Sequence, residues 1–282
     1  MLRSLYSGIS GLRVHQTMMD VTGNNIANVN TTGFKTSQTT FQDTLSQMMR
    51  AAGSPQAADG VNQAAGGSNP AQVGLGVRLA GIETNFGQGA AQTTGRKTDL
   101  MVQGDGFFVV QNGTEQLYTR AGSFSLDANS TLVTPDGNFV LGWNTTNGTI
   151  NTADPLEPVQ LPTDGSLESY TISQDGTLVG VMTDGTKRPI GRIAMGNFVN
   201  PGGLEKAGGS TYRATVNSGE ATVGTAGTGG MGLMQTGALE MSNVDLGQEF
   251  TNLIISQRGF QANTKVISTS DELLNDLVNL KR

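Results

Sequence analysis

Residues 239–278, LEMSNVDLGQEFTNLIISQRGFQANTKVISTSDELLNDLV, carry an apolar side chain at every seventh position. The repeated positions are Leu239, Leu246, Leu253, Phe260, Ile267 and Leu274. A seven-residue step predicts an α-helix whose apolar stripe packs against another helix. Ser242 is a suitable N-terminal cap, and Asp245 and Glu249 lie near the positive end of the helix dipole. We therefore expect a carboxyl-terminal helix that needs a partner to bury its stripe.

The amino-terminal end has the same spacing. Leu5, Leu12, Met19 and Ile26 repeat every seven residues, with Leu2 and Ile9 three residues ahead on a companion line. We expect the two terminal helices to pair in a coiled-coil-like domain formed by residues 1–35 and 240–282. The side chains expected to pack within this domain or against neighbouring copies are Leu2, Leu5, Ile9, Leu12, Met19, Ile26, Leu246, Phe250, Leu253, Ile254, Phe260, Ile267, Leu274, Leu277 and Val278. Two helices leave part of this surface uncovered, which predicts self-association.

The middle of the chain alternates apolar and polar residues between glycine-containing turns. Strands are expected over 100–110, 118–126, 131–141, 170–181 and 189–199. The dipeptides Asn112-Gly113, Asp136-Gly137, Asp175-Gly176 and Asp184-Gly185 are suited to the positive φ angles of tight hairpins. This pattern predicts a mostly antiparallel β domain over 76–217, and hence an α+β fold.

Two stretches rich in small residues, 50–72 and 218–237, separate the ends from the middle. Such composition is typical of linkers, so we expect extended linkers over 36–75 and 218–239.

Composition excludes several functions. The 282 residues have a net charge of −6 and no basic runs, which argues against nucleic acid and anionic membrane surfaces as partners. No apolar run is long enough for membrane insertion, and the amino terminus lacks the apolar core of a signal peptide. Without cysteine, and with His15 as the single histidine, a standard zinc or nucleophilic site is not expected. We expect His15 on the surface of its helix, and no catalytic, cofactor-binding or metal-binding residues.

Two motifs remain. Residues 23–35, GNNIANVNTTGFK, suggest a helix end in which asparagine side chains satisfy the last carbonyls and Gly33 makes a left-handed turn. Residues 237–246, GALEMSNVDL, lead to QRGFQAN at 257–263. Gly259 within a helix costs about 1 kcal/mol relative to alanine. Its presence therefore suggests tight packing against a neighbour.

These motifs, the opening MLRSLYSGISGL and the segment VGLGVRLAGIETNFGQGAAQTTGRKTDLMVQGDGFFVV at 73–110 resemble the flagellar axial proteins, the family of hook and rod subunits. The resemblance implies a non-enzymatic subunit, without cofactor, that forms a helical homopolymer. Its terminal helices would form the innermost tube, with the β domain outside. It also implies export through the flagellar type III apparatus without a cleavable signal peptide, and an extracellular place in the hook or basal body.

Within this family the motifs are most similar to hook subunits, which form the flexible joint that transmits motor torque to the filament. A hook subunit would have the distal rod protein, the hook cap protein and the hook–filament junction protein as neighbours. The distal rod protein is the alternative. An extra segment near the position of the long stretch 50–72 is a feature of that protein. Residues 143–170 are too short for the further outer domain of many hook proteins, so the chain resembles the compact version with a single β domain. A secreted enzyme or carbohydrate-binding module is a third interpretation, against which the two terminal seven-residue repeats argue.

Overall fold

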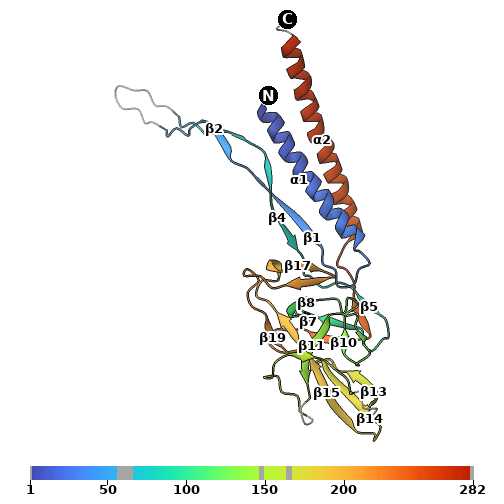
Figure 1. Cartoon of the computed structure of the whole chain (residues 1–282). Helices are drawn as coiled ribbons and strands as arrows, with labels where there is room; N and C mark the ends of the chain where they lie inside the picture. Colours follow the sequence, from blue (N-terminus) through green and yellow to red (C-terminus); the bar gives the residue numbers. More distant parts are fainter. Residues whose placement is uncertain (1, 56–65, 146–148, 163–166, 280–282) are drawn as a thin grey trace. The chain divides into compact units, whose positions relative to one another are not determined.

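The structure, a computed structural model, describes residues 2–55, 66–145, 149–162 and 167–279. The chain divides into two compact units. Unit 1 consists of Met1–Ile26, Ser37–Glu83 and Leu246–Arg282, and unit 2 consists of Ala27–Thr36 and Thr84–Asp245. Helices from both ends of the chain belong to unit 1, and antiparallel strands build unit 2 (Figure 1). The expected α+β fold is confirmed.

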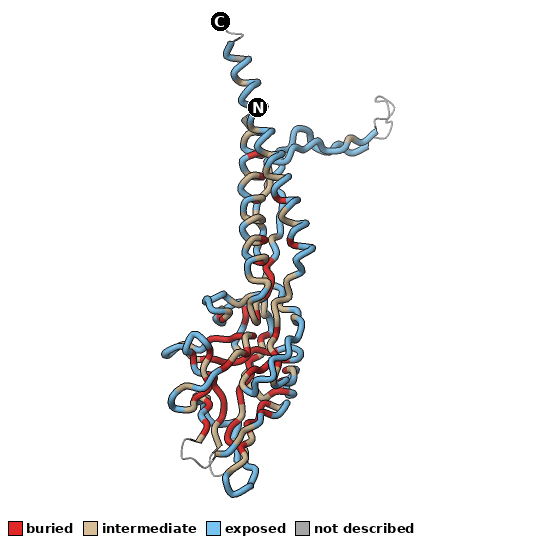
Figure 2. Tube along the Cα trace, turned by 90° about the vertical axis from the view of Figure 1, so that its right-hand side faces the viewer, coloured by how far each residue is buried: buried red, intermediate tan, exposed pale blue. Residues whose placement is uncertain are grey.

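Unit 1 contains two long helices and two small sheets. Its elements are α1 (Leu2–Ala27), β1 (Ser37–Asp43), β2 (Ser46–Arg50), β3 (Ala71–Gly74), β4 (Val77–Thr84) and α2 (Leu246–Asn279). The helices run antiparallel and side by side (Figures 1 and 2). Strand β1 pairs with β4, and β2 pairs antiparallel with β3. Because α2 begins at Leu246, Ser242 does not cap it directly. The Ser242 hydroxyl instead accepts a hydrogen bond from the Val244 N–H at 3.3 Å.

Unit 2 is built around one large antiparallel sheet with the strand order β13-β14-β15-β11-β7-β8-β18-β17. These strands span Leu167–Ile172, Thr177–Met182, Lys187–Ile193, Phe139–Asn144, Phe107–Asn112, Glu115–Thr119, Thr211–Arg213 and Glu205–Gly208, in that order. Five shorter strands join the sheet at β11, β7 or each other, namely β9 (Ser125–Leu126), β10 (Leu132–Val133), β12 (Glu157–Pro158), β16 (Met195–Asn197) and β19 (Thr222–Gly224).

Two further strand pairs and one short helix complete the described part of unit 2. Strand β6 (Leu100–Gln103) pairs with β20 (Leu233–Thr236), and β5 (Ala91–Thr93) pairs with β21 (Ala238–Glu240). The 3-10 helix η1 spans Pro201–Gly203. Most residues coloured as buried in Figure 2 belong to this unit. Its fully buried side chains include Phe107, Phe108, Phe124, Leu132 and Ile193.

The four predicted turn glycines all have positive φ angles, which range from 62° at Gly113 to 84° at Gly137. Each expected strand, however, is shorter than predicted or is divided. The expected strand over 100–110 splits into β6 and β7, because Gly104 and Gly106 have φ angles of 110° and 125°. The expected strand over 170–181 splits at Gly176, whose φ is 80°. Left-handed glycines interrupt a strand even where the flanking side chains keep their alternation.

The segments expected as linkers contain strands. Residues 36–75 contribute β1, β2 and β3 to unit 1, although residues 56–65 lie outside the described part of the chain. Residues 218–239 contribute β19, β20 and most of β21 to unit 2, where Met231 and Met234 are buried in the main core. The high content of small residues made this stretch resemble a linker. Its two methionines nevertheless pack into the core.

Candidate functional site

The two helices of unit 1 meet along a seam with one continuous register. Near the start of α1, the Ser4 hydroxyl lies 3.4 Å from that of Ser270. Near its end, the Asn25 amide donates to Glu249 Oε1 at 3.0 Å. Each step forward on α1 between these contacts is matched by one step back on α2. The helices therefore pair over nearly the whole of α1.

Glycine permits the close approach in the middle of this seam. A Cβ added to Gly11 would lie 2.7 Å from the Asn263 amide, and one added to Gly259 would lie 2.5 Å from the His15 ring. Neither space accepts a side chain without movement. The expectation of tight packing at Gly259 is confirmed, and the neighbour is α1 of the same chain. His15 accordingly lies half-buried in the seam rather than on the helix surface.

Small and polar residues fill the seam. The buried positions of the two helices are Gly8, Gly11, Val14, Thr22, Asn25, Glu249, Ser256 and Ser270. Sequence reasoning did not select any of them as packing residues. A usable signal was present, because Glu249, Ser256, Asn263 and Ser270 repeat every seven residues beside the apolar stripe. Hydrophobic periodicity does not detect a polar repeat.

The predicted apolar packing residues flank this seam and are not fully enclosed. Half-buried positions are Leu5, Leu12, Met19, Ile26, Leu253, Phe260, Ile267 and Leu274. Exposed positions are Ile9, Leu246, Phe250, Ile254 and Val278. The side chains of Leu2 and Leu277 lie outside the described residues. Unit 1 thus has an incompletely covered apolar surface, which is the property expected of a self-associating subunit.

Asn25 ties the end of α1 to two other elements. Its amide nitrogen donates to the Ser37 carbonyl at 2.8 Å as well as to Glu249, and its amide oxygen accepts from the Ser37 N–H at 3.1 Å. The side chain is buried, so these bonds replace the water that it loses. Asn25 therefore fixes the start of β1 and the first turn of α2, instead of satisfying the last carbonyls of its own helix as predicted.

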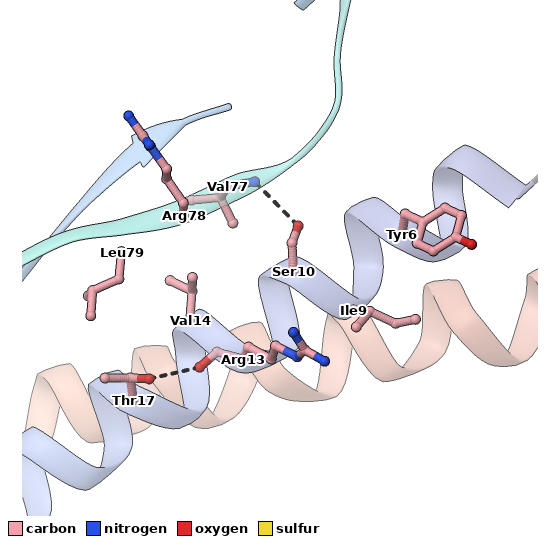
Figure 3. A pocket seen from close by; sticks show the side chains of 9 residues that line it. All are labelled: Tyr6, Ile9, Ser10, Arg13, Val14, Thr17, Val77, Arg78 and Leu79. Atoms are coloured by element: carbon pink, nitrogen blue, oxygen red, sulfur yellow. Dashed lines mark hydrogen bonds between the residues drawn. The ribbon is translucent and has the colours of Figure 1, made fainter. Parts of the chain in front are cut away.

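A groove of about 540 Å³ runs along α1 beside β4 (Figure 3). Val77 and Leu79 of β4 line one side, where the Val77 N–H donates to Ser10 Oγ at 3.3 Å. The α1 side is lined by the apolar or partly apolar residues Tyr6, Ile9, Val14 and Thr17, together with Arg13. Arg78 also contributes, but its side chain points away from α1. Arg13 is thus the cation that extends along the α1 side of the groove.

Unit 2 contains a buried ionic cluster that joins three of its segments. Glu240 Oε1 lies 2.5 Å from Lys35 Nζ, and Glu240 Oε2 lies 3.5 Å from Arg120 Nη1. The Lys35 ammonium also donates to the Gly87 carbonyl at 2.8 Å, and Glu240 accepts from the Gly89 N–H at 2.9 Å. Burial lowers the pKa of Lys35, an effect that Glu240 opposes. This cluster holds together the stretches by which the chain enters and leaves unit 2.

The described residues offer little chemistry. They contain no group of three histidine, cysteine, aspartate or glutamate side chains arranged to hold a metal ion. Within the same residues, neither long helix is apolar enough over its length to cross a bilayer. His15 Nδ1 is buried in the seam and has no hydrogen-bond partner among the described atoms. What unit 1 offers instead is surface for protein contacts.

An α+β chain whose two ends pair through helices that expose apolar side chains has the architecture expected of a self-assembling subunit. Similarity to known proteins identifies the family within this class. The profile described as "Flagella basal body rod protein" matches residues 5–35, "Flagellar hook protein FlgE/F/G D1 domain" matches 101–180, and "Flagellar basal body rod FlgEFG protein C-terminal" matches 235–280.

Whole proteins match over their full length. The flagellar basal-body rod protein FlgG of Bacillus subtilis is 48% identical over 285 residues, covering 100% of both chains. The FlgG of Borreliella burgdorferi is 38% identical over 286 residues, and its flagellar hook protein FlgE is 31% identical over 447, again with 100% coverage of both chains. The chain belongs to the family of flagellar hook and rod axial proteins.

Proposed function

We propose that this chain is the subunit of the distal rod, the alternative in the sequence analysis, rather than of the hook. The observation that carries the proposal is the length over which the relatives align. The rod protein of Bacillus subtilis aligns over 285 residues at 48% identity, almost without gaps beside a chain of 282. The hook protein of Borreliella burgdorferi needs 447 positions at 31% identity. The extra positions have no counterpart in this chain.

The connection between β11 and β13 also supports the proposal. Between β11 and β13 the sequence provides only residues 145–166, in which β12 is the one described strand. An inserted outer domain does not fit into so short a connection. The β2–β3 hairpin lies where the resemblance implies an extra rod segment. It exposes Met48, Met49 and Val73, and Leu45 directly before it is also exposed.

In this role the chain works as a structural subunit, without a reaction to catalyse. Exposed apolar side chains on α1 and α2 become buried against further copies, and that burial drives assembly. Membership of the family assigns the chain to the hook–basal body of the flagellum. Its neighbours in the proposed position are further copies of itself, with a hook subunit beyond them, and it reaches that position through the flagellar export apparatus.

Electron microscopy of basal bodies from a deletion strain tests the proposal. We expect truncated rods without hooks, and complete rods with hooks after the gene is restored. Complete rods that lack only hooks would assign the chain to the hook instead. Normal rods and normal hooks would refute both positions.

A further inference from the structure

The end of α2 extends past the beginning of α1. In the register set by Ser4 and Ser270, the residue opposite Leu2 is Glu272, so α2 residues from Leu273 onward have no α1 residue beside them. Figures 1 and 2 show this overhang, which reaches Asn279 in the described chain. Leu273 is 55% exposed and Val278 is 67% exposed. Among the described residues, these two apolar side chains are left largely uncovered, which indicates a surface available for contact.

The described end of α2 is also acidic. Asp276 lies in the overhang, Asp271 and Glu272 lie just before it, and no basic residue occurs between Lys265 and Lys281. Asp276 follows Leu273 by three positions and so lies on the same helix face. Lys281 and Arg282 lie outside the described residues. This helix end therefore offers one face that combines an exposed leucine with carboxylates.

The groove beside β4 has the complementary character. Tyr6, Ile9 and Arg13 follow one another at helical spacing along the face of α1 that lines it (Figure 3). Tyr6 is 69% exposed, and Ile9 and Arg13 are exposed as well. Arg3 and Arg13 are the charged residues of α1 before Asp20, so this part of the helix is basic. The groove, with its apolar residues and Arg13, is therefore complementary in charge and hydrophobicity to the α2 end, with Leu273 and its neighbouring carboxylates.

We propose that the acidic overhang of α2 docks into the α1 groove of a second copy of this chain. Leu273 packs against Tyr6 and Ile9, and the carboxylates of Glu272 and Asp276 face Arg13. The contact is heterologous, because the groove and the overhang are different surfaces. It therefore repeats from copy to copy without closing a dimer. The proposal rests on the polymeric function proposed above and adds a specific pair of contacting surfaces.

Disulfide cross-linking between two differently labelled chains tests the geometry, because the natural sequence has no cysteine. Ile9→Cys chains and Leu273→Cys chains are produced together in the bacterium, and isolated basal bodies are oxidised. We expect a cross-linked dimer only when both variants are present. The matched control is Ile254→Cys, since Ile254 is 56% exposed on the same helix. Equal cross-linking of Ile9→Cys to Ile254→Cys, or none to Leu273→Cys, overturns the proposal.

Charge exchange provides a second readout on the purified full-length chain. Arg13→Glu is expected to raise the critical concentration for assembly about threefold to tenfold, and high salt is expected to reduce the difference. Combining it with Glu272→Lys and Asp276→Lys in the same chain is expected to restore assembly. An unchanged critical concentration in Arg13→Glu overturns the docking alone. A natural chain that is absent from rods and does not polymerise overturns the proposed function, and the docking with it.

Discussion

Glu240→Gln tests the buried ionic cluster of unit 2 most directly. The substitution keeps the shape of the side chain and removes its charge, while Lys35 and Arg120 remain buried with at most 2% of either side chain exposed. The new amide nitrogen is a donor that faces other donors. Removing one partner of a buried ion pair costs about 3–5 kcal/mol, because the remaining charge is left uncompensated. We expect a loss of that size in the free energy of unfolding of unit 2.

Trp143 makes the measurement specific. It is the single tryptophan of the chain, it lies in β11 of unit 2, and it is 4% exposed. Urea unfolding followed by tryptophan fluorescence therefore reports on the unit that contains the cluster. The matched control is Glu115→Gln, which breaks the exposed pair with Arg213 and is expected to leave the midpoint nearly unchanged. A loss below about 1 kcal/mol in Glu240→Gln would refute the reasoning.

The same variant has a predicted pH dependence. Burial lowers the pKa of Lys35, and the nearby carboxylate of Glu240 limits that decrease. Without Glu240 the folded-state pKa falls further, while the unfolded chain keeps a value near 10.5. Between the two values the unfolded state binds more protons, so stability rises with pH. We expect the deficit of Glu240→Gln to shrink as the pH rises towards the unfolded-state value near 10.5. A constant or growing deficit contradicts this origin.

Four further substitutions have expected outcomes. Asn25→Ala removes three buried hydrogen bonds and should cost unit 1 about 2–4 kcal/mol by urea unfolding followed by helical circular dichroism, whereas the exposed Gln16→Ala should not. Gly11→Val overfills the seam and should destabilise the helix pair by about 1–3 kcal/mol. Gly23→Ala, for which no atom lies near the added Cβ, should stabilise α1 slightly. A higher melting temperature for Gly11→Val than for Gly23→Ala would contradict the close helix packing at Gly11. Burial raises the pKa of Tyr212 to about 12, so Tyr212→Phe should remove only the last step of an ultraviolet pH titration.

The sequence predicted the elements that depend on local rules. The terminal helices follow from their seven-residue stripes, and the four dipeptide turns follow from glycines that adopt positive φ. Gly259 is the most informative case. The free-energy cost of a glycine within a helix indicated a close neighbour, and the His15 ring packs directly against Gly259. These inferences succeed because turn conformation and helix spacing depend on a few adjacent residues.

The remaining features depend on partners that are distant in sequence. Asn25 and Glu249 are hydrogen-bonded although they are 224 residues apart in the sequence. Lys35 and Glu240 form an ion pair across 205 residues. Glu240 stands inside a motif that the sequence analysis singled out, and Glu249 was expected near the positive end of the helix dipole. Composition does not identify which cation or amide each one meets. The preference for hook over rod also rested on local resemblance, whereas full-length alignment favours the rod. The role of the apolar stripe in packing between copies stays a prediction, and within the chain the helix pair buries the polar repeat beside it.

That arrangement has a consequence for the free chain. A seam of glycine, serine and asparagine buries little apolar surface, so the pairing of α1 and α2 contributes a weaker hydrophobic gain than the core of unit 2. The exposed apolar side chains Ile9, Phe250 and Ile254 contribute little to this pairing, and association with another copy would bury them. We therefore expect the amides of both helices to exchange with deuterium faster than those of β7 and β8 in the monomer, and to become protected on assembly. Gly23→Ala should slow exchange in α1 modestly, whereas Phe250→Ser should leave the monomer unchanged and reduce the protection gained in the polymer. Helices already as protected as β7 in the monomer would show that this seam suffices by itself, and the outward apolar surface would then need another explanation.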